Sequence, residues 1–333
     1  MEDLLKHYPL QVSAASEIKK DKVWRLETNQ GTLALKKVNY PAEELLFIHS
    51  ITEYLISSGF PGLPEFVETS RGDAYVRWRG QIYYLSRWLP GRQADYGNKG
   101  DLAATARALA RFHLASRGYK PGRSYLARSN WGLWPHHFTN RLRHLQEFAR
   151  ISGEKSAPTE FELVFAGEVD RFYREGQQAL DFLSTTSYRQ MAVRGTETGW
   201  VCHHDLAQHN VIINGDTVQL IDFDYSFLDL PHHDLASLLI RNLRIHNWNP
   251  DKAWEIIDQY SGVLPLNRDD FLVILAKIWF PQEFWQYAFT YYREYIRTEE
   301  ECLVRLQWAI KMQEARKKFI NVMLTEMGRE RQP

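Results

Sequence analysis

Apolar residues follow a strand pattern early in the chain and a helical pattern later. Apolar runs of the strand type occur at 23–28, 31–38 and 81–89, bounded by turn residues such as Gly31 and the Pro90-Gly91 pair. β-Branched and aromatic residues enrich these runs, which favours extended structure. Beyond about residue 100, apolar residues recur mainly at helical spacing. The pattern therefore predicts strands first and mostly helices afterwards.

Helical spacing predicts several long helices. The expected helices cover 42–58, 101–116, 139–151, 160–183 and 303–327. The segment 119–138, rich in Gly, Pro, Trp and Arg, interrupts this series and is expected to be a loop.

A β-hairpin is predicted at 211–221. Two β-prone runs, 211–213 and 218–221, flank Asn214-Gly215-Asp216, a strong turn signal. Antiparallel pairing brings the outer ends of a hairpin together, so Asn210 is expected to lie beside Asp222.

Oxygen-bearing side chains gather around this hairpin. An amide oxygen from Asn210 and the carboxylate of Asp222 are hard ligands that suit Mg²⁺, an ion that also takes phosphate oxygens. Asp205, in the preceding loop, is expected to lie within reach of the same phosphates and could accept the proton of an attacking hydroxyl. The histidines of 203–209 and 232–233 raise a zinc hydrolase as an alternative, but their spacing matches no zinc site.

The motifs resemble those of one superfamily of kinases. His203-x-Asp205, then Asn210, then Ile221-Asp222-Phe223-Asp224 and Asp234-Leu235-Ala236 are similar to the motifs of aminoglycoside phosphotransferases and choline kinases. The resemblance implies an α+β, bilobal, protein-kinase-like fold. It places a small nucleotide-binding lobe with an antiparallel sheet at 1–89 and a mainly helical catalytic and acceptor-binding lobe at 90–333. ATP and Mg²⁺ are the implied cofactors, with an unidentified small-molecule acceptor.

The same resemblance assigns roles to single residues. Asp205 would be the catalytic base, and Asn210 and Asp222 would hold the metal. Lys36 would contact the α- and β-phosphates and be held by a glutamate of the next helix, Glu53 first and Glu44 in reserve. Lys37 should point to the opposite strand face.

The resemblance also places the adenine. Backbone groups around Ser86 and Trp88 would hydrogen-bond the base, although an edge strand and turn would give the same local pattern. The segment 16–23 departs from the family because it contains no glycine where relatives often have a Gly- or Ser-rich loop over the phosphates. Its three lysines could supply positive charge there instead.

Within the superfamily, the chain most resembles the CotS-like spore coat proteins of endospore-forming bacteria. The segments that carry this likeness are 31–36, 47–61 and 202–210, and it extends from about residue 10 to 320. It implies synthesis in the cytoplasm of the mother cell, deposition in the spore coat and other coat proteins as partners. It also opens an alternative function, that of a pseudokinase with a structural role in the coat.

Composition narrows the choice of partners and location. The chain has 41 acidic and 41 basic residues, so it lacks the global positive field that favours nucleic-acid binding. No apolar run reaches the roughly 18 residues of a membrane-spanning helix, and the first residues lack a signal-peptide pattern, so cytoplasmic retention is expected. Two cysteines form no disulfide framework or metal spacing.

Aromatic residues crowd the segment 279–295. Such rings could hold a choline-like acceptor by cation–π contacts. The alternative is that they form ordinary core, since aromatic side chains dominate core burial.

Overall fold

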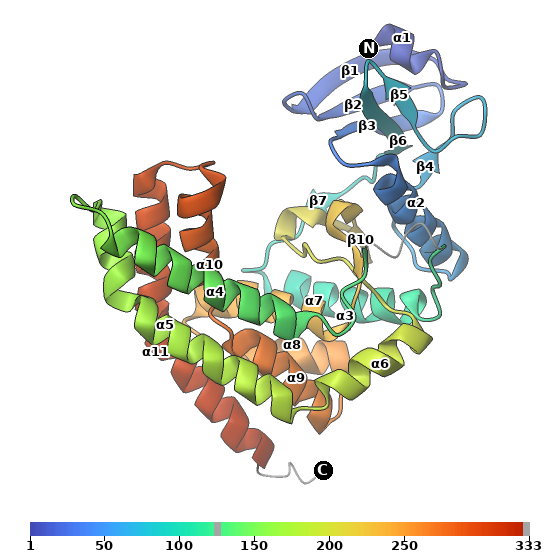
Figure 1. Ribbon diagram of the computed structural model, residues 1–333. Coiled ribbons are helices and arrows are strands. Elements are labelled where there is room, and N and C mark those ends of the chain that lie inside the picture. Colours follow the sequence, from blue (N-terminus) through green and yellow to red (C-terminus); the bar gives the residue numbers. More distant parts are fainter. Residues whose placement is uncertain (123–127, 329–333) are drawn as a thin grey trace. The chain divides into compact units, whose positions relative to one another are not determined.

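A computed structural model describes residues 1–122 and 128–328, which form two compact units (Figure 1). Of the described residues, the first unit comprises 1–122, 128–129 and 198–228, and the second comprises 130–197 and 229–328. The predicted lobes, 1–89 and 90–333, divide the chain differently and stay a prediction. The segment 198–228, which carries the expected catalytic motifs, belongs to the first unit.

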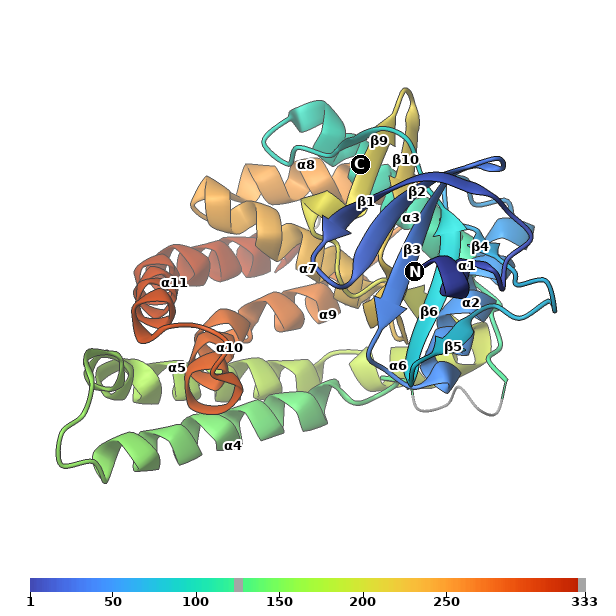
Figure 2. The same cartoon turned by 90° about the horizontal axis from the view of Figure 1, so that it is seen from above.

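The first unit is built on a six-stranded antiparallel sheet with the order β1-β2-β3-β6-β4, in which β5 also pairs with β6 (Figure 2). This confirms the predicted antiparallel sheet. The strands are β1 (Val12–Lys19), β2 (Val23–Thr28), β3 (Gly31–Val38), β4 (Phe66–Val67), β5 (Val76–Trp78) and β6 (Gln81–Arg87).

The segment 16–23, expected to cover the phosphates as a loop, is mostly strand. β1 continues to Lys19, which pairs with Val23, so only a tight turn remains. In that turn the backbone N–H of Lys22 donates to the carbonyl oxygen of Lys19 at 3.0 Å. Asp21 adopts a φ of 52°, a conformation that Asp tolerates better than most residues. The missing glycine is thus compatible with a short β-hairpin.

Helices of the first unit are α1 (Glu2–Leu5), α2 (Ala42–Ser57) and α3 (Lys99–Ser116). The two longer ones confirm the predicted helices at 42–58 and 101–116. α2 buries Leu45, Ile48, Ile51 and Leu55, which recur at helical spacing. The Asn98 side chain caps α3 by accepting hydrogen bonds from the first free N–H groups.

The predicted hairpin is confirmed as β9 (Val211–Asn214) and β10 (Thr217–Leu220). Gly215 opens its two-residue turn with a φ of 56°, which glycine adopts without strain. β7 (Arg92–Gln93) pairs with β9, and a Cβ atom on the nearby Gly91 would lie 2.5 Å from the carbonyl oxygen of Ile213. A short pair, β8 (Val201–Cys202) with β11 (Phe227–Leu228), completes this unit.

The second unit is helical. Its helices are α4 (Trp134–Gly153), α5 (Glu160–Thr185), α6 (Tyr188–Thr198), α7 (His232–Leu243), α8 (Pro250–Ser261), α9 (Arg268–Trp279), α10 (Gln282–Phe289) and α11 (Glu299–Gly328), with a π-helical turn at Thr290–Glu294. No described helix combines the length and the apolar composition that crossing a bilayer requires.

One predicted boundary in this unit is wrong. The helix expected to begin at residue 139 begins at Trp134, inside the segment predicted as loop. Pro135 lies in the first turn, where a missing N–H costs nothing, so the proline starts this helix instead of preventing it. Residues 123–127 of the predicted loop lie outside the described part of the chain.

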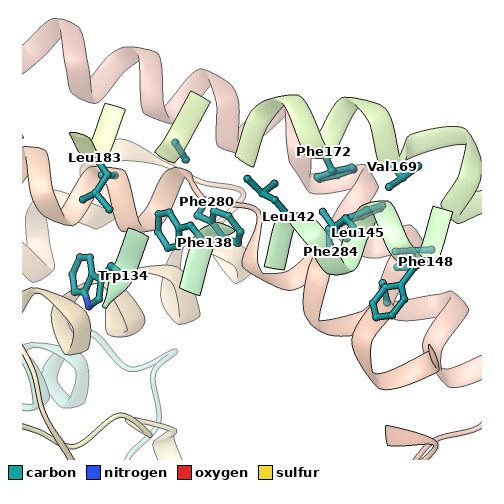
Figure 3. Packing of buried hydrophobic residues seen from close by; sticks show 14 of the residues in the cluster. Trp134, Phe138, Leu142, Leu145, Phe148, Val169, Phe172, Leu183, Phe280 and Phe284 are labelled. Carbon is teal, nitrogen blue, oxygen red and sulfur yellow. The ribbon is translucent and has the colours of Figure 1, made fainter. Parts of the chain in front are cut away.

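Aromatic rings form the core of the second unit (Figure 3). Phe138 of α4 stacks on Phe280 with ring centroids 4.1 Å apart, and Phe172 of α5 stacks on Phe284 at 3.9 Å. Several rings of the 279–295 segment are therefore ordinary core, as the alternative interpretation expected.

Candidate functional site

Lys36 lies on β3 with its side chain turned inward. It pairs with Tyr84 of β6 and is 8% exposed. Ala34, two residues earlier on the same strand face, lines the same cavity as Lys36. Lys37 is half-buried and lies on the other face. The strand register is thus the predicted one.

Two aspartates hold the Lys36 ammonium. Its Nζ lies 2.5 Å from Oδ1 of Asp222 and 2.8 Å from Oδ1 of Asp224, and the Tyr40 hydroxyl donates to Asp224 at 3.0 Å. Burial by itself would lower the pKa of Lys36, but the neighbouring Tyr84, Asp224 and Asp222 outweigh it and raise that pKa.

Asp222 shows the reciprocal effect. Burial acts to raise its pKa, but the charge and hydrogen bond of Lys36 lower that pKa below the ordinary value. The carboxylate is therefore ionised at neutral pH, as a metal ligand must be. The pair contributes stability above the unfolded carboxyl pKa of about 3.9, and this contribution is lost as pH falls through the folded pKa.

The structure does not bring either predicted glutamate to Lys36. Glu53 has a side chain that is 59% exposed, and its Oε1 lies 4.0 Å from Nε2 of His49. Glu44 instead forms an ion pair with Arg128, whose Nη2 lies 2.5 Å from its Oε2. The predicted lysine–glutamate pair is therefore replaced here by a pair between Lys36 and the two aspartates.

Arg128 was not identified from the sequence. Its Nη1 donates to the backbone carbonyl oxygens of Asp224 at 2.8 Å and Ser226 at 3.2 Å. Through Arg128, Glu44 is tied to the backbone that carries Asp224. No motif marks this arginine, because its partners lie far from it in the sequence.

A buried histidine fixes the loop that carries Asp205. Nδ1 of His203 accepts the backbone N–H of Asp205 at 3.3 Å, and Nε2 lies 2.9 Å from the carbonyl oxygen of Ile221. These contacts require the proton on Nε2. Because both ring nitrogens are engaged with the backbone, His203 is a poor metal ligand, which weakens the zinc alternative.

Asn210 is oriented by Asp205. Its amide nitrogen donates to the backbone oxygen of Asp205 at 3.0 Å and to its carboxylate at 2.9 Å. The amide oxygen of Asn210 makes no hydrogen bond within the described residues, so it is available to a cation. The donor set therefore fits Mg²⁺, which prefers oxygen ligands.

The hairpin brings Asn210 and Asp222 together as predicted. The backbone N–H of Ile221 donates to the carbonyl oxygen of Asn210 at 3.0 Å, which joins the two outer ends. Asp222 then takes a left-handed conformation, with φ 66° and ψ 64°. Such strained residues cluster at functional sites.

These side chains face a cavity of about 340 Å³ within the first unit. That volume is typical of small-molecule sites. Its lining includes Lys19, Lys22, Ala34, Lys36, Tyr84, Ser86, Arg87, Trp88, Leu89, His209, Asn210, Ile212, Ile221 and Asp222. Lys19 and Lys22, from the glycine-free turn, bring positive charge to the cavity.

The segment predicted to bind adenine lines the cavity, but one of its expected hydrogen-bond donors is already in use. Ser86 and Trp88 are both present, but the backbone N–H of Trp88 already donates to the carbonyl oxygen of Thr32 at 3.1 Å. The next N–H, of Leu89, has no backbone partner in the part of the chain described. Leu89 is thus the better donor for a base, and no pattern in the sequence indicates this shift.

Comparisons with known proteins agree with the fold and the motifs. Residues 1–323 match the family described as spore coat putative kinase YutH. Spore coat protein S of Bacillus subtilis is 25% identical over 327 residues, covering 96% of this chain and 92% of that protein.

Solved structures share the fold. An aminoglycoside phosphotransferase from Alicyclobacillus acidocaldarius has a TM-score of 0.81 at 22% identity, covering 98% of this chain and 96% of its own. Spectinomycin phosphotransferase in complex with ADP and spectinomycin has a TM-score of 0.65 at 12% identity, covering 95% and 97%. The resemblance to aminoglycoside phosphotransferases, choline kinases and spore coat proteins is confirmed, and the chain belongs to the YutH family of putative spore coat kinases.

Proposed function

We propose that this protein is an ATP- and Mg²⁺-dependent phosphotransferase that phosphorylates a hydroxyl group of a small molecule. One observation carries the proposal: Lys36, Asn210 and Asp222 line one cavity, and Asn210 is hydrogen-bonded to Asp205. Spectinomycin phosphotransferase, which shares the fold, was solved with ADP.

Each residue has a distinct task in this proposal. Asn210 and Asp222 hold the metal, which neutralises phosphate charge when bound. Lys36 exchanges its contact with Asp222 for the phosphates of ATP and stays paired with Asp224. Asp205 accepts the acceptor's hydroxyl proton as the new bond to the γ-phosphorus forms and the bond to the β–γ bridging oxygen breaks. The Leu89 N–H and the strand end at Ser86 position the base.

A second function, that of a coat pseudokinase, is favoured by two observations. The turn between β1 and β2 lacks the glycines that let a backbone approach phosphates, and Lys36 is already paired with Asp222. In this alternative the fold is a scaffold for other coat proteins. In either case the family relationship supports synthesis in the mother-cell cytoplasm and deposition in the coat.

Label transfer separates the two functions. The protein is incubated with Mg²⁺, [γ-³²P]ATP and the small-molecule fraction of sporulating cells, and products are separated by size and charge. Phosphotransferase activity predicts a small labelled phosphate ester with the wild type. Absence of a labelled product at saturating ATP would favour the scaffold.

Asp224, rather than a helix glutamate, is expected to position Lys36. Asp224→Asn should lower kcat/KM for ATP about tenfold, since a hydrogen bond to a charged group contributes about 1.5–3 kcal/mol. Glu53→Gln should change it by less than about twofold, because an exposed pair contributes little. A larger loss of kcat/KM in Glu53→Gln than in Asp224→Asn would contradict this expectation and favour the predicted pair between Lys36 and Glu53.

A further inference from the structure

A second group of basic side chains lies in the second unit. His137 and Arg141 are four residues apart on α4 and so share one side of that helix. Lys277 of α9 lies over the ring of Trp134, with its Nζ 4.5 Å from the ring centre. We call the two cations Arg141 and Lys277, together with the neighbouring His137, the cationic stripe. Two of its aromatic neighbours, Trp134 and Phe138, appear in Figure 3.

Arg141 is the unusual member of the stripe. Its guanidinium carbon lies 4.7 Å from the ring centre of Trp285 and 5.9 Å from that of Phe280. Across residues 1–122 and 128–328 it forms neither a hydrogen bond nor an ion pair. Burial lowers its pKa to about 10. Arg141 is half-buried, so its charge is partly removed from water while its donors have no partner among the described residues, and proteins normally pair such a group.

Lys277 adds a second positive charge close to His137. Burial, followed by the charges of Arg141 and Lys277, lowers the pKa of His137 to about 4, so this ring is neutral at neutral pH. Asp229 acts in the opposite direction, but its carboxylate already accepts the Trp134 indole N–H at 3.1 Å and the Leu230 backbone N–H at 2.8 Å. A bound anion would supply the counter-charge that Arg141 lacks among the described residues.

We propose that the cationic stripe binds an oxyanionic group, a carboxylate or a phosphate, of a small molecule. The planar guanidinium of Arg141 can hold either group through two parallel hydrogen bonds. The same geometry argues against a choline-like cation at these rings, since Arg141 and Lys277 already occupy the faces of Trp285 and Trp134. The proposal does not depend on phosphotransferase activity.

Fluorine NMR can test this site directly. The full chain is labelled with 5-fluorotryptophan, the Trp285 resonance is assigned with Trp285→Phe, and sodium phosphate and sodium acetate are titrated separately against sodium chloride at equal ionic strength. We expect a saturable shift of the Trp285 resonance with at least one oxyanion and none with chloride. Which of the two probes saturates distinguishes phosphate from carboxylate recognition.

Four variants locate the effect. The shift should be lost in Arg141→Met and partly retained in Arg141→Lys. It should persist in Arg143→Met, which removes an exposed arginine from the same helix. It should also persist in Lys36→Met, which excludes anion binding at the nucleotide cavity as its source.

Thermal unfolding gives an independent criterion. Without an oxyanion, Arg141→Met should unfold within a few degrees of the wild type or above it, because an unpaired charge has been removed. The proposal is overturned if the wild type shows no saturable shift or if Arg141→Met responds equally. It is also overturned if Arg141→Met fails to fold, since the arginine would then be structural.

Discussion

Replacement of Asp205 by Asn is expected to lower the rate of phosphoryl transfer about 10³-fold while leaving the Kd for Mg-ATP within about twofold. Asparagine keeps the size of the side chain and can still hydrogen-bond Asn210, but it cannot accept the proton of the acceptor hydroxyl. Label transfer measures the rate, and calorimetric titration measures binding. An effect on rate alone would assign Asp205 to the chemical step.

Asp216→Asn is the matched control for this prediction. Asp216 lies exposed in the turn of the same hairpin, between β9 and β10, so the same chemical change occurs away from the cavity. We expect the control to behave as the wild type. If Asp205→Asn retained more than about a tenth of the activity, Asp205 could not be the base.

The second large effect is expected when the proposed metal ligand Asp222 is removed. Asp222→Ala should weaken Mg-ATP binding about a hundredfold, because a carboxylate ligand of the cation is lost. Without Mg²⁺, the variant and the wild type should bind ATP with similar affinity. Calorimetric titration of both proteins, with and without Mg²⁺, measures all four affinities.

The fold should survive this change. Lys36 remains paired with Asp224 in Asp222→Ala, so its charge is not left alone. Asp216→Ala provides the control for the substitution itself. Equal Mg-ATP affinity in the wild type and Asp222→Ala would contradict the metal assignment.

Much of the site could be predicted because local sequence determines it. A two-residue turn at Gly215 sets the hairpin register, which brings Asn210 and Asp222 together. Strand alternation turns Lys36, and not Lys37, toward the cavity. Turn chemistry and alternation act over a few residues, so a single sequence is sufficient to reveal them.

The contacts that sequence analysis missed depend on packing between distant segments. Whether Lys36 meets Glu53 or Asp224 depends on how α2 is placed against β3, which sequence separation does not determine. Arg128 reaches Glu44 and the backbone of Asp224 from residues far along the chain. The proposal assigns the adenine donor to Leu89 because the Trp88 N–H is already used in a hydrogen bond to Thr32 that extends the sheet.

Anomalous diffraction tests the central claim most directly. Crystals grown with Mn²⁺ in place of Mg²⁺ and with a non-hydrolysable ATP analogue are measured at a wavelength where manganese scatters anomalously. We predict a manganese peak coordinated by the Asn210 amide oxygen and the Asp222 carboxylate, with the phosphates of the analogue beside Lys36. An analogue bound in the cavity with no manganese at these two residues, or no bound analogue at millimolar concentration, would contradict the account.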